Sequence, residues 1–346
     1  MNQHPCNNSS LSGAVDPPDV TVVVPVYNAG CHLDACLESI LSQTLPRIEI
    51  LCVDDHSTDG STDILAAYGK SDSRVRVLSN PGKGAAAARN VGLEHARGRY
   101  VWFADADDSA EPTLCDRAVA AAESRGADVV VFRYDGIAAV DGVRLDVFAF
   151  PWLWPWSRGR FGGTGPAGRL TFRDVAGSVW NKLFRTQFLR DRRIVFPPTR
   201  TAEDTAFVAQ ALVATRRWVP VNEVLYHYRR GMPQGLLASR EDGLLDFCEA
   251  WRYLLERLEA LGGGAADRNW LIAHAFARIV KALRASTSMS AFSMNYADVR
   301  NRWLPLLGVD GHVQRMPEES REAYLAIFRD IMAEPDAFLF LVRRAH

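Results

Sequence analysis

Apolar runs alternate with segments of helical spacing through the first 134 residues of the chain. The runs are rich in β-branched residues and nearly continuous in hydrophobicity, which is typical of parallel strands buried on both faces. Between them, apolar residues recur at the three- and four-residue spacing of helices. This alternation predicts an α/β fold with a mostly parallel central sheet flanked by helices. The predicted strands span residues 20–24, 48–53, 75–78, 100–104 and 129–132.

The regular alternation stops after this unit. Residues 140–150 suit a hairpin, 151–168 form a loop rich in Gly, Pro and Trp, and a helix at 204–214 and a strand at 221–228 follow. Further on, the pattern is helical throughout. We therefore expect three parts, which are a disordered lead-in at residues 1–19, a catalytic domain at 20–230 and a helical C-terminal region at 231–346.

Two apolar stripes at helical spacing lie in the C-terminal region. One follows Leu244, Phe247 and Trp251, and the other includes Phe276 and Ile279. Such stripes face either a core or a partner helix. We favour packing within the chain, with a homodimer seam through these helices as the alternative.

Charge and cysteine content narrow the class of protein. With 40 basic and 41 acidic residues, the net charge of −1 gives no general attraction to nucleic acid. The six cysteines show no CxxC pair or metal-ligand spacing, which fits free thiols in a reducing compartment. The first 19 residues lack the features of a signal peptide, and no apolar run is long enough to span a bilayer. We expect a cytoplasmic protein, with peripheral contact at the inner face of the membrane left open by the apolar run 338–342.

Carboxylates stand at the ends of two predicted strands. Asp54 and Asp55 follow the second strand, and Asp105, Asp107 and Asp108 follow the fourth. Isolated buried charge is costly, so acids at the end of a buried strand indicate a cation. Two acids at i and i+2 can hold Mg²⁺ or Mn²⁺ and leave positions open for phosphate oxygens. The two strand ends together predict a nucleotide site at the edge of the sheet.

Four short motifs stand in a fixed order in the first third of the chain. They are VVPVYN at 23–28, VDDHSTDG at 53–60, GAAAARNVG at 84–92 and FADADD at 103–108. Together they resemble the family 2 glycosyltransferases, inverting enzymes with the GT-A fold. Each motif alone is weak, whereas four in register are strong. The family usually has glycine after the paired acids, where this chain has His56.

The resemblance implies a site for a nucleotide-sugar donor. It places the base and ribose against the end of the first strand and against Asp54. It also places basic residues near the diphosphate. A strand terminator, a helix cap and a surface lysine are the structural alternatives for Pro25, Asp54 and Lys83. The residues assigned to the donor are Pro25, Tyr27, Asn28, Asp54, Lys83, Arg89 and Asp105.

The resemblance also implies a divalent ion, Mg²⁺ or Mn²⁺. Asp107 is the expected ligand, because the ion must bridge the diphosphate and stabilise charge on the leaving group. His227, in the predicted strand 221–228, is a second candidate for contact with the metal or the diphosphate. A structural histidine is the more common alternative for His227.

Glu203 and Asp204, before the predicted helix, resemble the Glu-Asp segment of the family. Inversion requires one carboxylate to take the proton of the acceptor hydroxyl as its oxygen attacks the sugar C1. The resemblance gives this role to Asp204, with Glu203 as its partner. An acidic helix start favoured by the helix dipole is the alternative.

Two further segments are candidates for the acceptor side. Trp180, Asn181 and Lys182 resemble the segment that helps to form this side in relatives, with an aromatic core anchor as the alternative. In the Trp-rich loop three tryptophans stand at every second position, so an extended segment places them on one side. We expect Trp154 to belong to a lid or acceptor platform, and a hydrophobic plug over the core has equal weight.

These expectations describe a metal-dependent enzyme of hexosyl or N-acetylhexosaminyl transfer. The donor is a nucleotide-sugar, with a UDP-sugar favoured, and the acceptor is the hydroxyl of a glycan, a lipid-linked molecule or a small molecule. Surface polysaccharide synthesis is favoured over decoration of a secondary metabolite. A sugar nucleotidyltransferase needs a Gly-rich basic loop directly after the first strand, where residues 25–28 read PVYN. A non-catalytic nucleotide-sugar-binding scaffold is the alternative from another class, and the intact carboxylates disfavour it.

Overall fold

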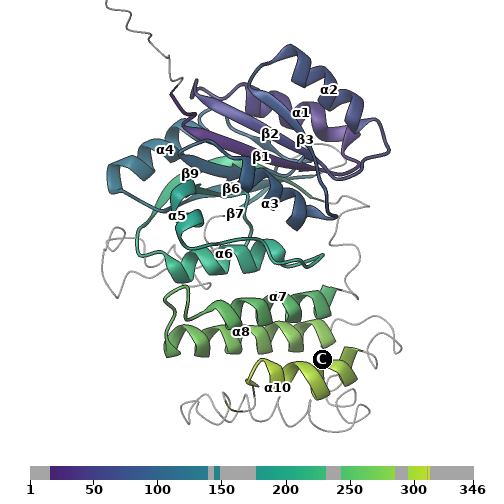
Figure 1. Cartoon of the computed structure of the whole chain (residues 1–346), viewed down its shortest axis with the longest axis vertical. Coiled ribbons are helices and arrows are strands. Elements are labelled where there is room, and N and C mark those ends of the chain that lie inside the picture. The colour runs from purple at the N-terminus through teal and green to yellow at the C-terminus, as the bar shows by residue number, and fades with distance from the viewer. Residues whose placement is uncertain are drawn as a thin grey trace, which may run out of the picture.

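A computed structural model describes residues 16–138, 144–148, 177–230, 243–284, 295–309 and 311. In this part of the chain nine strands form one sheet, helices cover it, and further helices stack beneath it (Figure 1). The strands are β1 (Val20–Val26), β2 (Ile48–Asp54), β3 (Val75–Ser79), β4 (Tyr100–Phe103), β5 (Ser109–Ala110), β6 (Val129–Ala138), β7 (Arg144–Phe148), β8 (Lys182–Arg185) and β9 (Trp218–Arg230).

The helices between the strands lie where the apolar spacing predicts them, and the C-terminal region contributes further helices. Each of these helices has buried residues that face the sheet or a neighbouring helix. The helices are α1 (Gly30–Leu41), α2 (Ser61–Ser71), α3 (Ala85–His95), α4 (Leu114–Arg125), α5 (Thr186–Asp191), α6 (Glu203–Ala214), α7 (Gly243–Arg257), α8 (Ala265–Arg284), the π-helical turn η3 (Val299–Trp303) and α10 (Leu304–Leu306).

The sheet has a parallel half and a mixed half. Its order is β3-β2-β1-β4-β8-β6-β9-β5, with β7 paired to β6. The pairs β3–β2, β2–β1 and β1–β4 are parallel, which confirms the predicted arrangement of the first strands. The short strand β8 then runs antiparallel to both β4 and β6, and β9 runs parallel to β6 with two register shifts. The sheet is mixed because β8 is antiparallel to both of its neighbours. The alternation of strands and helices in the sequence did not reveal β8, which has only four residues.

Helix α3 lies directly on β1 because of one glycine. A Cβ at Gly92 would lie 2.2 Å from Cγ1 of Val23, far inside van der Waals contact. Glycine at this position therefore permits the close approach of helix and strand. The approach brings Arg89, one turn earlier on α3, to the carboxyl edge of the sheet.

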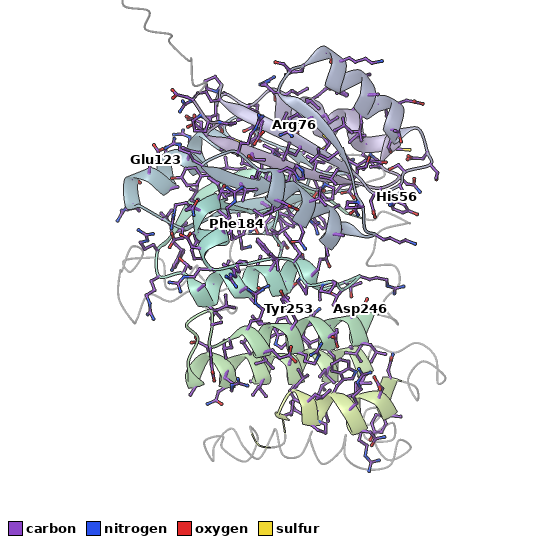
Figure 2. All side chains as sticks on the ribbon, viewed as in Figure 1. His56, Arg76, Glu123, Phe184, Asp246 and Tyr253 are labelled. Carbon is purple, nitrogen blue, oxygen red and sulfur yellow. The ribbon has the colours of Figure 1, made fainter. Side chains whose placement is uncertain are left out.

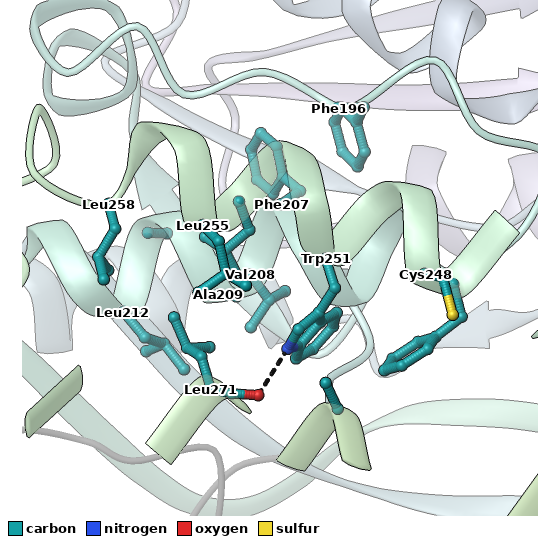
Figure 3. Packing of buried hydrophobic residues seen from close by; sticks show 14 of the residues in the cluster. Phe196, Phe207, Val208, Ala209, Leu212, Cys248, Trp251, Leu255, Leu258 and Leu271 are labelled. Carbon is teal, nitrogen blue, oxygen red and sulfur yellow. Dashed lines mark hydrogen bonds between the residues drawn. The ribbon is translucent and has the colours of Figure 1, made fainter. Parts of the chain in front are cut away.

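The C-terminal helices share a core with the catalytic half of the chain. Helix α7 packs on α6, and α8 packs on α7. Phe207 of α6, Trp251 of α7 and Leu271 of α8 lie in one buried cluster, in which Trp251 Nε1 donates a hydrogen bond to the Leu271 carbonyl at 2.9 Å (Figure 3). The interpretation of the two apolar stripes as packing within the chain is thereby confirmed. The boundary at residue 230 stays a prediction.

None of the described helices combines the length and apolar character needed to cross a bilayer.

Candidate active site

Two loops at the carboxyl ends of β1 and β2 form the first part of the site. Tyr27 follows β1 with 61% of its surface exposed, and Asn28 has a left-handed backbone with φ of 48°. The Asn28 N–H donates to Ser57 Oγ at 3.1 Å, and Asn28 Oδ1 accepts from the Thr58 N–H at 2.8 Å. These bonds fasten the two loops to each other and leave the Tyr27 ring open to solvent.

The paired acids after β2 have different surroundings. Asp55 is buried and accepts hydrogen bonds from Asn80 Nδ2 at 2.6 Å and from the Gly84 N–H at 2.8 Å. It therefore shapes the loop before α3, a role that the sequence analysis missed. Among the described residues the Asp54 carboxylate accepts only from the Ser57 N–H, at 3.3 Å. Its position at the strand end beside Val26, next to the Pro25–Val53 pair, leaves Asp54 as the acid that can accept from a ligand.

His56 preserves the loop shape that glycine usually provides. Its φ of 63° lies in the left-handed region, which glycine adopts without strain. Its Nε2 lies 3.1 Å from the Gly82 carbonyl and so connects this loop to the segment before α3. Lys83, in that segment, is exposed at the same edge. Figure 2 shows His56 at the end of the molecule where these loops gather.

Arg89 joins the two acidic motifs of the site. Its Nη2 lies 2.7 Å from Asp105 Oδ1, and its Nη1 lies 2.9 Å from Glu203 Oε1. Only 7% of the Arg89 side chain is exposed. Two buried ion pairs on one planar guanidinium fix both carboxylates in direction as well as distance. The structure thus brings together residues that are 114 positions apart in the sequence.

The acidic loop after β4, residues 104–108, is held in place by β9 in the mixed half of the sheet. Tyr226 Oη of β9 accepts from the Asp105 N–H at 3.2 Å and donates to Asp108 Oδ2 at 2.7 Å. Asp108 Oδ1 accepts from the Arg229 N–H at 2.7 Å, and Arg229 Nε donates to the Asp107 carbonyl at 2.8 Å. Asp108 is therefore an anchor of the loop. Sequence analysis missed Tyr226, although its alternation with His227 and Tyr228 in a strand was the available indication.

The Asp107 carboxyl is partly buried and lies close to the charge of Asp105. Burial and the charge of Asp105 raise the pKa of the Asp107 carboxyl to about 6. Among the described residues no side chain donates a hydrogen bond to this carboxylate, and none of them form a cluster of three or more ligating groups. Mg²⁺ is commonly bound through one or two carboxylates together with substrate phosphates rather than by a complete protein cage. The donor set present here fits such an ion.

His227 is placed differently from the expectation. Its Nδ1 lies 2.5 Å from Asp135 Oδ1, and its Nε2 lies 3.0 Å from Glu111 Oε1. A metal ligand needs a free ring nitrogen, and both nitrogens are already engaged. In this structure His227 bridges two carboxylates, because the alternation of β9 side chains turns Tyr226 toward the acidic loop instead. The candidate metal role of His227 stays a prediction.

The two acids at the start of α6 are not equivalent. The Glu203 carboxylate is buried and bonded to Arg89. Its pKa is raised to about 7, mainly by burial and to a smaller extent by the charge of Asp204. Burial also raises the pKa of Asp204. Asp204 Oδ1 accepts from the N–H of Thr205 at 2.5 Å and from its hydroxyl at 3.1 Å, and Oδ2 has no recorded partner among the described residues. Asp204 is thus the better-placed group to accept a proton.

Two of the residues expected on the acceptor side are packed into the protein. Trp180 is buried in a stack, with ring centroids 4.7 Å from Tyr226 and 5.2 Å from Tyr228. Asn181 is buried and donates to the Phe132 carbonyl at 3.2 Å. Both residues show the core packing that was the alternative for this segment, since β8 enters the sheet here, and an acceptor role for them stays a prediction. Trp154 lies outside the described residues.

Lys182, the third residue of that segment, is fully buried beside the base candidate. Its Nζ donates to the Ser178 carbonyl at 2.5 Å and to Asn181 Oδ1 at 2.6 Å. Burial lowers its pKa to about 7, and the charge of Asp204 opposes that shift. Its ammonium is therefore an electrostatic neighbour of Asp204 rather than an exposed acceptor contact.

Comparison with known proteins defines the family. A model described as Glycosyl transferase family 2 matches residues 21–174. The succinoglycan biosynthesis protein ExoO of Rhizobium meliloti (strain 1021) is 30% identical over 298 residues, which cover 81% of this chain and 82% of ExoO. The chain belongs to glycosyl transferase family 2.

Further relatives of this family 2 glycosyltransferase show how far the likeness extends. EpsH of Bacillus subtilis (strain 168) is 33% identical over 218 residues, so the chain spans 62% of the length of EpsH. The crystal structure of S. aureus TarS 1–349 with UDP-GlcNAc aligns with a TM-score of 0.67 and 22% identity, covering 92% of this chain and 89% of TarS 1–349. This structural likeness confirms the predicted GT-A fold.

Proposed function

We propose that this family 2 glycosyltransferase moves a sugar, with inversion at C1, from a nucleoside-diphosphate donor to the hydroxyl of a glycan acceptor. One observation carries the proposal. Arg89 bonds to Asp105 at the end of the donor edge and to Glu203 beside Asp204, so the donor carboxylates and the base candidate belong to one buried network. A structural acidic cluster alone would not need a connection between these two motifs.

Proton transfer is assigned to the start of α6. The acceptor oxygen forms a bond to C1 while the bond from C1 to the diphosphate oxygen breaks, and the hydroxyl proton passes to Asp204. Glu203 stays bonded to Arg89 and fixes the direction in which the adjacent Asp204 points. The raised pKa of Asp204 makes this carboxylate a stronger proton acceptor than an ordinary aspartate.

The donor binds at the ends of β1 and β2 in this proposal. The exposed ring of Tyr27 offers an apolar surface for the base, and Asp54 accepts hydrogen bonds from the base or ribose. Asp107, assisted by Asp105, is the residue that would hold a divalent ion, which supplies positive charge to the leaving diphosphate when bound. Lys83, exposed at the same edge, adds further positive charge.

The names of two similar proteins support the choice of substrates to test. ExoO is named for succinoglycan biosynthesis, and TarS 1–349 was crystallised with UDP-GlcNAc. We infer from them that a polysaccharide is the first class of acceptor to examine and UDP-GlcNAc the first donor.

Calorimetric titration tests the donor site. Nucleoside diphosphates and nucleotide-sugars, with and without Mn²⁺, are titrated into wild type and Asp107→Ala. The proposal expects metal-dependent binding of one nucleotide that Asp107→Ala loses, while Asp116→Ala, on the exposed side of α4, retains it. Absence of binding to every nucleotide would contradict the proposed donor site. The anomeric configuration of a product, read by NMR, then tests inversion.

A further inference from the structure

A charged hollow lies at the edge of the sheet opposite the carboxylates. It has a volume of about 440 Å³. Because β8 is antiparallel to β4, Lys182 lies near the acidic loop after β4, whereas Arg185 pairs with Tyr100 at the start of that strand. Figure 2 places Glu123, which lies 2.7 Å from Arg99 at this start, on the side of the molecule away from His56. The charged residues that line the hollow are Asp128, Arg185, Asp191, Arg192, Arg216 and Arg217.

One buried carboxylate organises half of this lining. Asp128, with 7% of its side chain exposed, accepts from Arg185 Nε at 2.9 Å and Nη2 at 2.6 Å. It also accepts from Arg217 Nη2 at 2.8 Å and from the Thr215 hydroxyl at 3.2 Å. Two guanidinium groups are therefore held side by side on a single acid. The Nη1 atom of each arginine has no recorded partner among the described residues.

Two further arginines add charge that the lining does not balance. Arg192, which follows α5, and Arg216, which follows α6, are both exposed (Figure 1 shows the two helices). Neither forms an ion pair with any residue in the described part of the chain. The second acid, Asp191, accepts from Gln187 Nε2 at 2.7 Å. Four guanidinium groups thus face two carboxylates, which leaves an excess of two positive charges around one concave surface.

The chemistry of this lining favours phosphate. The planar guanidinium fork matches the geometry of phosphate oxygens and is weakly hydrated, so arginine binds phosphate in a bidentate manner. The volume lies within the usual range of small-ligand sites. Backbone bonds fix the lining, because the Arg217 carbonyl accepts from the Asp128 N–H at 2.7 Å and the Arg192 N–H donates to the Phe188 carbonyl at 3.1 Å.

We propose that this hollow binds a phosphate-bearing ligand, either a soluble phosphorylated molecule or the headgroup of an anionic lipid, at a site separate from the donor. Helix α6 connects the two places, since it begins at Glu203 in the active site and ends at Ala214 in the wall of the hollow. The proposal goes beyond the transferase activity and does not depend on it.

Titration with inorganic pyrophosphate in metal-free buffer tests the site. The double variant Arg192→Gln/Arg216→Gln removes the two unbalanced charges without touching Asp128. The matched control, Lys70→Gln/Arg125→Gln, removes the same charge from exposed positions on α2 and α4. We expect pyrophosphate affinity to fall by about tenfold or more in the first variant and to change little in the control, because charge-assisted hydrogen bonds are lost only there. Equal affinity in both variants and wild type would overturn the proposal.

A second measurement separates the two sources of phosphate. The same proteins are sedimented with vesicles of phosphatidylcholine alone and with vesicles that also contain phosphatidylglycerol. Binding to the mixed vesicles that is lost in Arg192→Gln/Arg216→Gln supports a lipid headgroup, and pyrophosphate binding without vesicle binding supports a soluble ligand. Titration of UDP with Mn²⁺ reports the donor site independently, so failure of the hollow and failure of the proposed transferase function remain distinguishable.

Discussion

The parallel and mixed halves of the sheet contribute to the active site in different ways. The parallel half supplies Asp54 from the last position of β2, and Asp105 and Asp107 from the loop that follows β4. The mixed half, with α6, supplies partners for part of this edge: Tyr226 within β9 accepts from the Asp105 N–H, and Glu203 at the start of α6 bonds to Arg89, which also pairs with Asp105. The difference teaches that the acids come from local strand ends, whereas part of their geometry depends on partners from the other half of the sheet.

The largest expected effect tests the different roles proposed for Asp204 and Glu203 at the start of α6. Asp204→Asn should lower kcat by about 10²–10⁴-fold with little change in donor KM, because it removes the proton acceptor. Glu203→Gln should lower kcat less, since its carboxylate is bonded to Arg89 rather than open to the acceptor. Steady-state kinetics with a purified acceptor measures both. A larger loss in Glu203→Gln than in Asp204→Asn would reverse the two roles.

The next effect breaks the link between the halves. Arg89→Met leaves Asp105 and Glu203 without their common cation and should lower the free energy of unfolding by about 3–5 kcal/mol, the usual cost of an uncompensated buried charge. Urea unfolding measures the change. The double variant Arg89→Met/Glu203→Gln should recover part of it, since one unpaired carboxylate is gone. Equal stability of the single and double variants would show that Glu203 is not held by Arg89.

The aromatic stack of the mixed half gives a third test. Trp180→Ala should lower the free energy of unfolding by about 3 kcal/mol because it empties the space between Tyr226 and Tyr228. Acceptor KM should stay unchanged in protein that remains folded, since the ring is buried. Thermal unfolding and kinetics below the transition measure the two quantities. A rise in acceptor KM without loss of stability would restore the acceptor role first expected for Trp180.

The smallest effect concerns the charge of the Asp107 carboxyl in the parallel half. The raised pKa of Asp107 means that the folded state binds its proton more tightly than the unfolded chain does. Its contribution to stability is thus present at low pH and is lost as pH rises from about 4 to about 6. Asp107→Asn should therefore raise metal-free stability by about 1–3 kcal/mol near pH 7. Near pH 4 the gain should vanish.

Urea unfolding of Asp107→Asn without metal at the two pH values checks this prediction, with Asp116→Asn as an exposed control. The same substitution should abolish metal-dependent nucleotide binding. A variant that is less stable near pH 7 would contradict the view that Asp107 is an uncompensated acid in the metal-free protein.

The parallel half was largely predictable, and the mixed half was less so. Local hydrophobic runs and turns predict strands β1 to β4 and the acids at the ends of β2 and β4. The antiparallel β8 did not follow, because four residues carry too little periodicity to identify a strand. For the same reason the sequence left open whether Trp180 and Asn181 lie at the acceptor or in the core. The carboxylate partners of His227 could not be predicted, because the register of β9, with its two shifts near Phe132, decides which of its side chains faces the acidic loop.

The sequence by itself determined the fold class, the family resemblance and the candidate acids of the site, since each depends on residues that are close together in the chain. Only the tertiary structure decided which acid each partner holds. Arg89 meets Glu203 across 114 positions, Tyr226 reaches Asp108 across 118, and Asp128 gathers Arg185 and Arg217 at the opposite edge. Such pairings depend on strand register and helix packing. These place side chains to within a hydrogen-bond length, and no local pattern in the sequence encodes that precision.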